Sequence, residues 1–442
     1  MKPDGDTTLV IGSLEIARRT CAALMARGQR VIHLLQPTET DIRAALSAGV
    51  TAVAVLVRGD VTALRYALFV EHLLPEVPLV VTLFDRTVAG QLVRAVPNCR
   101  VTSPADIAVP SIIGACLGDV LAVDQDANGP FVLTRAPGGV TRTPWRPRHS
   151  RLGLLRNALA SQARPHDTTS TILLAGLAGL LLALGTDWLI AMTALHHSPG
   201  RALYAAARIV ATVGPADADA DAPAWYLAFA TAAMLLTIGT TALFTAGVVN
   251  RLRSPRSVSL IGRRTLPTRD HVVVVGLGQV GLRLCTHLRR LRIPVVAVER
   301  NPRATNLRLA RKANVPVLIA HAGDRNILRT LSLHRARALA AMGADELDNV
   351  AVAITALSVA SDLRIVLRAG ENEVIAETRS LFHIGEVRDV TALTTAAVTL
   401  SITGQPWQTV YASDHDLLAY PALDSASAAP VRCECDGTPV LK

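Results

Sequence analysis

The stretch HVVVVGLGQVG, residues 271–281, decides the fold of the C-terminal part of the chain. Its four consecutive valines are typical of a strand buried in a parallel sheet, and the glycines after them have the spacing GxGxxG. A helical pattern of leucines comes next, and then a second apolar run, residues 294–298, which ends at Glu299. A GxGxxG between a strand and a helix, with an acid about 20 residues further on, predicts a Rossmann-type dinucleotide-binding unit.

Each residue type in this motif has a physical reason. Gly276 allows the tight turn, Gly278 lets a pyrophosphate approach the amides at the helix N-terminus, and Gly281 permits close packing of helix on sheet. Glu299 would accept hydrogen bonds from ribose hydroxyls and repel a 2′-phosphate, which favours NAD(H) or an adenine nucleotide over NADP. The neighbouring Arg300 weakens that preference. We expect a cofactor site formed by Gly276, Gly278, Gln279, Val280, Gly281, Glu299, Arg300, Gly323 and Asp324.

Further strand patterns follow at residues 315–320 and 338–342, and apolar runs at residues 350–357 and 363–367. Gly323-Asp324 comes after the third strand, and Asp345, Asp348 and Asn349 come after the fourth. This order, over residues 271–401, resembles the RCK or Trk/Ktr N-domain family. Because that family regulates potassium channels and transporters, the resemblance implies a regulatory domain. The acids among these residues leave a divalent cation open as a second ligand.

The first 140 residues look like a divergent copy of the same unit. Residues 9–12, LVIG, correspond to residues 273–276, and residues 78–82 correspond to residues 363–367. The turn after the first strand lacks the second and third glycines, and the second strand ends at Gln36-Pro37, where no acid stands. We therefore expect this copy to be structural and to bind no dinucleotide.

Two long apolar runs, residues 170–190 and 224–249, are each long enough to cross a hydrocarbon core of about 30 Å. The first holds one charge, Asp187, which we expect at the membrane interface. Arginines cluster on the outer flank of each run, and this positive-inside pattern predicts a bacterial plasma-membrane protein with both termini in the cytoplasm. The flanking arginines are Arg142, Arg146, Arg148, Arg151, Arg156 and Arg164 before the first run, and Arg251, Arg253, Arg256, Arg263 and Arg264 after the second.

The segment between the two runs predicts a short helix that starts at Pro199 and ends at Thr-Val-Gly, residues 212–214. Here the sequence resembles the two-helix potassium channels, in which four copies of a TVGYG filter replace the ion's hydration shell with backbone carbonyls. The resemblance implies a homotetramer in the lipid bilayer that conducts inorganic ions. The pore residues would be Thr212, Val213, Gly214, Pro215, Ala216, Asp217 and Arg208, and the gating hinge would be Gly239 and Gly247.

Two departures put potassium selectivity in doubt. Pro215 and Ala216 stand where the family has an aromatic residue and a glycine, so the outer half of the filter lacks its usual backbone freedom. Arg208 would raise the barrier to cations unless it is paired, and the acids of residues 217–221 are candidates for that pairing. The same acids also fit either a solvated loop or a vestibule that attracts cations.

Composition limits the other function classes. The net charge is +10, yet aromatic residues make up only 3% of the chain and no basic stripe is interleaved with them, so we expect no nucleic-acid partner. No nucleophile with an adjacent base and no metal-ligand cluster stands out, so we expect no enzyme, and an NAD-dependent oxidoreductase is a minority alternative.

These observations lead to one arrangement and one main alternative. We expect α/β Rossmann-like domains on both sides of an α-helical pore hairpin, in a channel gated by nucleotide or ion binding. The main alternative is a non-conducting, membrane-anchored nucleotide sensor. The expected divisions are residues 1–140 and 269–401 for the two α/β domains, 141–168 and 251–268 for basic linkers, 169–250 for the pore and 402–442 for a C-terminal extension with a flexible end.

Overall fold

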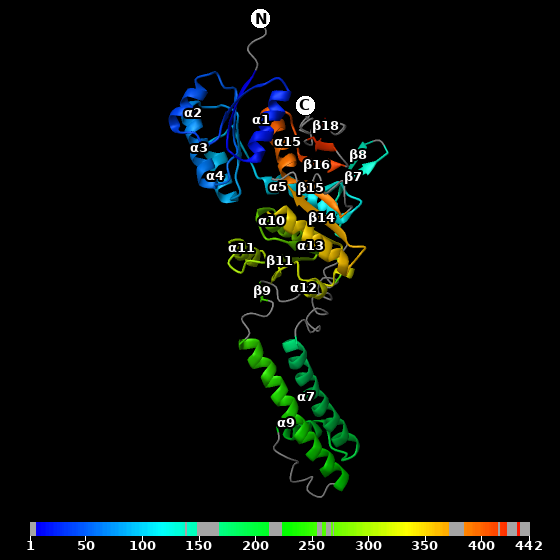
Figure 1. Ribbon diagram of the computed structural model, residues 1–442. Coiled ribbons are helices and arrows are strands. Elements are labelled where there is room, and N and C mark those ends of the chain that lie inside the picture. Colours follow the sequence, from blue (N-terminus) through cyan, green and yellow to red (C-terminus); the bar gives the residue numbers. More distant parts are fainter. Residues whose placement is uncertain are drawn as a thin grey trace. The chain divides into compact units, whose positions relative to one another are not determined.

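The computed structural model describes residues 6–137, 139–147, 168–211, 223–253, 259–261, 267, 269–370, 384–413, 416–421 and 431–433. The chain forms two compact units (Figure 1). One unit joins Met1–Ala158 to Leu260–Lys442, and the other is Leu159–Ser259. The two polar parts, which we expect from the sequence to be separate domains, therefore belong to a single unit.

The N-terminal half of the first unit is a parallel sheet of five strands in the order β2-β1-β3-β4-β5. Its strands are β1 (Thr7–Ile11), β2 (Arg30–Leu34), β3 (Ala52–Val55), β4 (Leu79–Thr82) and β5 (Cys99–Thr102). Its helices are α1 (Glu15–Ala26), α2 (Glu39–Leu46), α3 (Asp60–Leu73) and α4 (Arg86–Ala95). α2, α3 and α4 form one core with the sheet, and α1 joins a second core on Val10 and Val80. Strands covered on both faces are continuously apolar, which is why they could be read from the sequence.

The C-terminal half repeats this topology in a sheet of seven strands in the order β15-β14-β13-β10-β11-β12-β9. The strands are β9 (Ser259–Ile261), β10 (Val272–Val275), β11 (Val295–Glu299), β12 (Val317–Ile319), β13 (Ala338–Ala341), β14 (Arg364–Ala369) and β15 (Glu386–Asp389). The helices between them are α10 (Gln279–Arg290), α11 (Leu307–Lys312), α12 (Arg325–Thr330) and α13 (Glu346–Val359). β1, β2, β3 and β4 hold the same places as β10, β11, β13 and β14, which confirms the predicted correspondence between the halves.

The two halves exchange one helix each (Figure 1). Helix α5 (Pro104–Leu117) follows the N-terminal sheet, yet Ile112 and Ile113 share a core with Val272 and Val274 of β10. Helix α15 (Val390–Ile402) follows the C-terminal sheet, yet Val398 packs with the core of β1, β3 and β4 on the N-terminal sheet. Each sheet therefore has one of its covering helices supplied by the other half.

A small antiparallel sheet follows each exchanged helix. The first consists of β6 (Ala122–Asp126), β7 (Gly129–Ala136) and β8 (Gly139–Pro144), and the second of β16 (Thr409–Ser413), β17 (Asp416–Tyr420) and β18 (Val431–Arg432). Phe131 and Leu133 of the first sheet pack with Tyr411 of the second. The small sheets thus close the unit at the place where the halves meet.

The first of these sheets crosses one of the expected divisions. β8 crosses the expected boundary at residue 140, and Trp145 packs on the core and donates its indole N–H to the carbonyl of Leu291 at 3.1 Å. Arg142, which we counted in the basic flank, forms an ion pair with Asp126 and lies 4.0 Å from the ring centroid of Phe131. Residues 402–442 likewise contain β16, β17 and β18.

The second unit has two long helices, α7 (Thr168–Thr193) and α9 (Ala224–Arg253), and a short helix, α8 (Pro199–Val210), between them. Ala175–Thr193 and Ala224–Val249 are long and apolar enough to cross a membrane. α7 and α9 pack closely at two glycines of α7. A Cβ on Gly176 would lie 2.7 Å from the backbone nitrogen of Phe244, and a Cβ on Gly179 would lie 2.5 Å from Thr240 Cγ2. The predicted start of the short helix at Pro199 is confirmed.

The expected position of Asp187 at the membrane interface stays a prediction, but the structure shows how its side chain packs. Its side chain is buried, with 0% of the residue exposed. Ala191, four residues later, is also fully buried. Residues four apart lie on one helix face, so Asp187 occupies the packed face of α7 and does not face outward at its end.

Candidate nucleotide site

A cavity of about 330 Å³ lies at the carboxyl ends of β10, β11 and β13, lined among others by Gly276, Gly278 and Glu299. A second hollow of about 420 Å³ adjoins it and shares Leu277, Gly278 and Glu299. The strand order reverses between β10 and β13, and this switch point is where open α/β sheets bind their ligands. The topology thus brings the predicted glycine turn and the predicted acid to one place.

The three motif glycines have different geometries. Gly276 has φ +88°, and a Cβ there would lie 2.8 Å from the nitrogen of Gly343. A Cβ on Gly281 would lie 2.0 Å from the carbonyl oxygen of Gly276. Gly278 has φ −66°, and among the described residues no atom lies within 4 Å of a Cβ built on it. Gly276 and Gly281 are therefore needed for the fold, whereas Gly278 leaves room for a ligand at the N-terminus of α10.

The Glu299 carboxylate lies beside this turn. It accepts hydrogen bonds from the backbone N–H of Leu277 and of Asn301, each at 2.8 Å. From the other side, the side-chain amide of Asn306 donates to the carbonyl of Leu277 at 2.9 Å. Asn306 was not predicted from the sequence. It is the N-cap of α11, and an asparagine at the start of a helix is the pattern that could have identified it. An acceptor for ribose hydroxyls is thus fixed next to the open position at Gly278.

Asn349 supports the loop after β13, a role that was not predicted from the sequence. Asn349 is 2% exposed, and its side chain accepts from the backbone N–H of Gly343 at 2.9 Å. It also donates to the carbonyls of Gly343 at 3.1 Å and Arg368 at 3.3 Å. A Cβ on Gly343 would lie 2.8 Å from the Asn349 side-chain oxygen. The loop after β13, which forms one wall of the cavity, is therefore held by a single buried amide.

The remaining predicted cofactor residues are not all brought to the cavity. Arg300 and Gly323 line it, and Arg300 forms an exposed ion pair with Asp348 at 3.3 Å. Val280 is 3% exposed, and its side chain lies in the core. Gln279, the first residue of α10, is exposed. A ligand in the cavity would therefore contact Val280 and Gln279 only through their backbone atoms.

The acidic residues considered as ligands for a divalent cation form helix-capping hydrogen bonds in the structure. Asp324 accepts from the backbone N–H of Asn326 at 2.8 Å, as the N-cap of α12. Asp345 caps α13 through the N–H groups of Leu347 and Asp348. Within the described part of the chain, no group of three or more His, Cys, Asp or Glu residues could hold a metal ion.

The N-terminal copy has a different first turn. Gly12 has φ +147°, and a Cβ there would lie 2.0 Å from the carbonyl oxygen of Leu56. Glu15 is the first residue of α1, and its carboxylate pairs with Arg18 at 2.6 Å and Arg19 at 3.0 Å. The tight turn is retained, but a carboxylate stands at the helix start, where it would repel a pyrophosphate.

The expected filter, Thr212, Val213, Gly214, Pro215, Ala216 and Asp217, lies outside the described residues. Arg208 lies in the last turn of α8 and is half-buried. Gly239 is exposed and Gly247 is buried, both within the continuous helix α9. The roles assigned to these residues stay predictions.

Comparison with known proteins bears on residues 272–383, which match the model of the TrkA-N domain family. The chain contains a TrkA-N domain. An uncharacterized protein of Methanothermus fervidus is 26% identical over 117 residues, 26% of this chain and 18% of that protein. The putative K(+) efflux antiporter KefB of Alkalimonas amylolytica is 30% identical over 124 residues, 28% of this chain and 17% of that protein. The chain thus spans less than a fifth of either relative.

Among solved structures, the GsuK channel is similar over 91% of this chain and 64% of that chain, with 13% sequence identity and a TM-score of 0.50. At this identity the similarity establishes the fold alone. It covers most of the chain, whereas the TrkA-N match covers only the C-terminal half of the first unit. The Rossmann-like character of the C-terminal half is therefore supported both by sequence and by structure.

Proposed function

We propose that this chain is the subunit of a homotetrameric ion channel in a bacterial plasma membrane, opened or closed by NAD(H) or an adenine nucleotide bound to its TrkA-N domain. The observation that carries the nucleotide site is the open space at Gly278, at the N-terminus of α10 and next to the Glu299 carboxylate. Helix N-termini attract phosphate, and the carboxylate is an acceptor for ribose hydroxyls.

The channel part of the proposal is supported by the second unit. In sequence order, the shorter helix α8, which begins at a proline, stands between two helices of membrane-spanning length. This is the order of elements expected of a two-helix pore, and a filter made of backbone carbonyls needs four chains around one axis. The name of one relative, a putative K(+) efflux antiporter, places a similar domain in a cation-transport protein.

A non-conducting nucleotide sensor is the alternative, and Arg208 favours it. A guanidinium at the end of α8 stands where the permeation path would begin, and it raises the barrier to cations. In both cases the nucleotide is a regulator that is not consumed. NADH incubated with the purified protein should therefore keep its absorbance.

The experiment uses a pair of matched substitutions at two helix N-caps. Gly278 and Gly59 are the N-caps of α10 and α3, and both have negative φ, so valine is tolerated at either backbone. Gly278→Val fills the ligand space, and Gly59→Val fills an open position away from the cavity. Binding of NADH and of ADP to the detergent-purified full chain is measured by calorimetry, and ion flux is measured in liposomes with and without each nucleotide.

We expect Gly278→Val to abolish nucleotide binding and the nucleotide's effect on flux, while Gly59→Val resembles the wild type. Nucleotide binding without flux under any condition would leave the sensor as the function. Failure of NADH, ADP and ATP to bind the wild-type protein would overturn the nucleotide site itself.

A further inference from the structure

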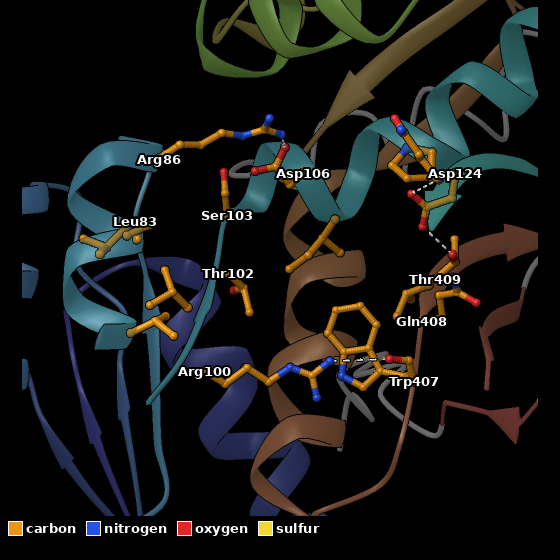
Figure 2. Close-up of a pocket in the computed structure, with 18 of the residues that line it drawn as sticks. Leu83, Arg86, Arg100, Thr102, Ser103, Asp106, Asp124, Trp407, Gln408 and Thr409 are labelled. Atoms are coloured by element: carbon orange, nitrogen blue, oxygen red, sulfur yellow. Dashed lines mark hydrogen bonds and ion pairs between the residues drawn. The ribbon is translucent and has the colours of Figure 1, made fainter. Parts of the chain in front are cut away.

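A larger cavity, of about 640 Å³, lies away from the nucleotide site, between α4, β5 and α5 of the N-terminal half and the segment Trp407–Val410 of the C-terminal half (Figure 2). None of the site residues predicted from the sequence lines it. Its walls come from both halves of the first unit, so it exists only because the halves are joined.

One wall is the edge strand β5 and the start of α5. Arg100 and Thr102 are two residues apart, so they project from the same face of the strand. The Arg100 guanidinium lies 4.4 Å from the ring centroid of Trp407 and donates to the Trp407 carbonyl at 3.4 Å (Figure 2). In the described part of the chain it has no carboxylate partner. The positive charge of Arg100 is therefore not neutralised by an acid in this wall.

The hydroxyls at the end of the strand also lack partners. Ser103 is 4% exposed, and neither its Oγ nor the Oγ1 of Thr102 has a hydrogen-bond partner among the described residues. Ser103 is the N-cap of α5, a helix of 14 residues, yet its side chain makes no capping bond. Buried polar groups are nearly always satisfied, so two unsatisfied hydroxyls at a cavity wall point to a missing partner.

The acids of the cavity are already engaged. Asp106 pairs with Arg86 at 2.9 Å and with Arg283 at 3.0 Å. Asp124 accepts from the Thr409 hydroxyl and from the backbone N–H of Gln125, and burial raises its pKa. Neither carboxylate faces the two hydroxyls as a partner, so the charge that Arg100 and the N-terminus of α5 present to the cavity is positive.

The rest of the lining is apolar. Leu83, Ile107, Pro110 and Trp407 line the space together with the polar wall. An indole beside a guanidinium offers a flat surface for a ring or an apolar chain. The ligand therefore needs two parts, an oxyanion and an apolar body.

We propose that this cavity is a second ligand site, which binds a small organic oxyanion, a carboxylate or a phosphate ester with an aromatic or apolar body. The oxyanion accepts hydrogen bonds from the Thr102 hydroxyl and from the guanidinium of Arg100, which share one face of the strand. The body lies along Trp407. Because Trp407 belongs to the C-terminal half and the Thr102 hydroxyl to the N-terminal half, the ligand bridges the two.

The test measures binding to the detergent-purified full chain by calorimetry with four probes: phenyl phosphate, benzoate, inorganic phosphate and phenol. The first two have both parts of the ligand, and the last two have one each. We expect phenyl phosphate or benzoate to bind at one site per chain and more tightly than either single part, and the tighter of the two identifies the oxyanion.

Two variants and a control locate the site. Arg100→Gln should weaken binding by about tenfold and Thr102→Val by about threefold, in line with the loss of hydrogen bonds to the ligand. Arg43→Gln, at an exposed arginine of α2, should leave binding unchanged. The Thr102 hydroxyl has no hydrogen-bond partner among the described residues, so Thr102→Val breaks no bond of the fold and keeps the test valid even where Arg100→Gln reduces stability.

Absence of saturable binding by both two-part probes would overturn the proposal. So would unchanged affinity in both variants, or binding of inorganic phosphate or phenol as tight as that of the two-part probes. The NADH titration of Gly278→Val is independent of these results, because Gly278 does not line this cavity.

Discussion

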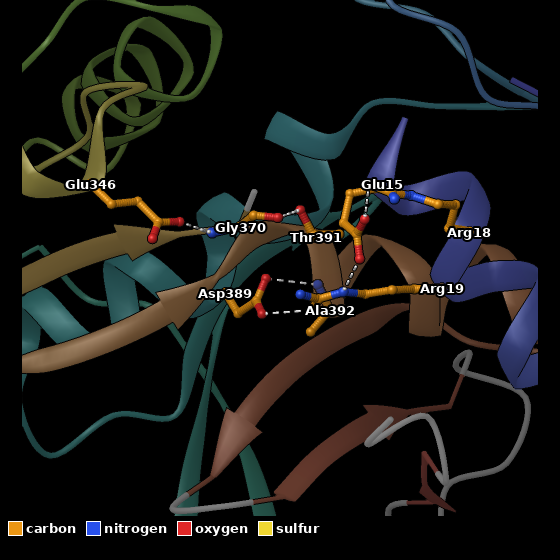
Figure 3. A network of polar contacts seen from close by, with 8 residues as sticks. All are labelled: Glu15, Arg18, Arg19, Glu346, Gly370, Asp389, Thr391 and Ala392. Carbon is orange, nitrogen blue, oxygen red and sulfur yellow. Dashed lines mark hydrogen bonds and ion pairs between the residues drawn. The ribbon is translucent and has the colours of Figure 1, made fainter. Parts of the chain in front are cut away.

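The guanidinium of Arg19 on α1 lies 3.0 Å from a carboxylate oxygen of Asp389, the N-cap of α15 (Figure 3). This ion pair joins the first helix of the N-terminal half to α15, the helix of the C-terminal half that covers the N-terminal sheet. Asp389 also accepts from the backbone N–H of Ala392 at 2.9 Å. On the other side of the same helix start, the Thr391 hydroxyl donates to the carbonyl of Gly370, whose N–H donates to Glu346 at 2.8 Å. Glu346 begins α13, the helix that carries Asn349.

Breaking this ion pair should have a measurable but small effect. Arg19→Gln and Asp389→Asn are made singly and together, because asparagine keeps the cap on α15 while it removes the charge. Both side chains are 35% exposed, so solvent screens the pair, and we expect a coupling of about 0.5–1 kcal/mol. Urea unfolding of the purified chain measures it. Additive effects would show that the pair does not join the halves.

Removing the Asn349 side chain should destabilise the wall of the nucleotide cavity. Asn349→Ala leaves the half-buried N–H and carbonyl of Gly343 without their side-chain partner, and we expect a loss of about 2 kcal/mol in the free energy of unfolding. Asn349→Asp should be at least as destabilising as the alanine variant at neutral pH, because it places a buried carboxylate oxygen against the carbonyls of Gly343 and Arg368. The matched control is Thr355→Ala on the exposed face of α13, and a loss of equal size there would contradict this account.

Two histidines, the buried His271 and the half-buried His287, should make stability depend on pH. Burial lowers the pKa of His271 and of His287 from 6.5 to about 4, against the raising effect of the Leu331 carbonyl on His271 and of the Asp106 charge on His287. The unfolded chain therefore binds more protons between these values, so stability is full above about pH 6.5 and is lost as pH falls toward about 4.

At about pH 5 the loss should be about 2 kcal/mol for each histidine relative to neutral pH. Chemical denaturation at several pH values, followed by tryptophan fluorescence, measures it. The His287→Leu variant should show a smaller slope of unfolding free energy against pH. An unchanged slope would mean that His287 is not the group that titrates.

The crossing of α7 and α9 should depend on the glycines of α7. Gly176→Leu would push its side chain into the backbone of Phe244, and we expect about 1–3 kcal/mol of destabilisation from overpacking. Gly239→Leu is the control, because a Cβ at Gly239 meets no described atom within 4 Å. Thermal unfolding in detergent compares the two. If Gly239 is also the gating hinge, its substitution should change flux while the melting temperature stays the same.

The parts of the fold that the sequence predicts are those with strong local patterns. β1 and β10 are runs of apolar residues because both faces are covered, and Gly276 and Glu299 have the spacing of a known turn. Other features have no such signal. α5 and α15 are apolar all round, so nothing in their sequence says which sheet each one covers.

The polar sites show the same division. Asn306 and Asn349 act through backbone groups that are distant in sequence, so only the folded chain reveals them. Ser103 and Trp407 are ordinary residues until the exchange of helices brings their segments to one cavity. A site built from two halves has no motif of its own, because each half contributes single residues with no characteristic spacing.

The exchange of α5 and α15 has a consequence for the order in which the chain can fold. During synthesis the N-terminal sheet leaves the ribosome first, but the core that contains Val10 and Val80 is completed only by Val398 of α15. Until then this apolar face is covered by α1 alone, and α5 has no C-terminal sheet to pack on. The nascent N-terminal half therefore keeps apolar surface exposed until nearly the whole chain has been made.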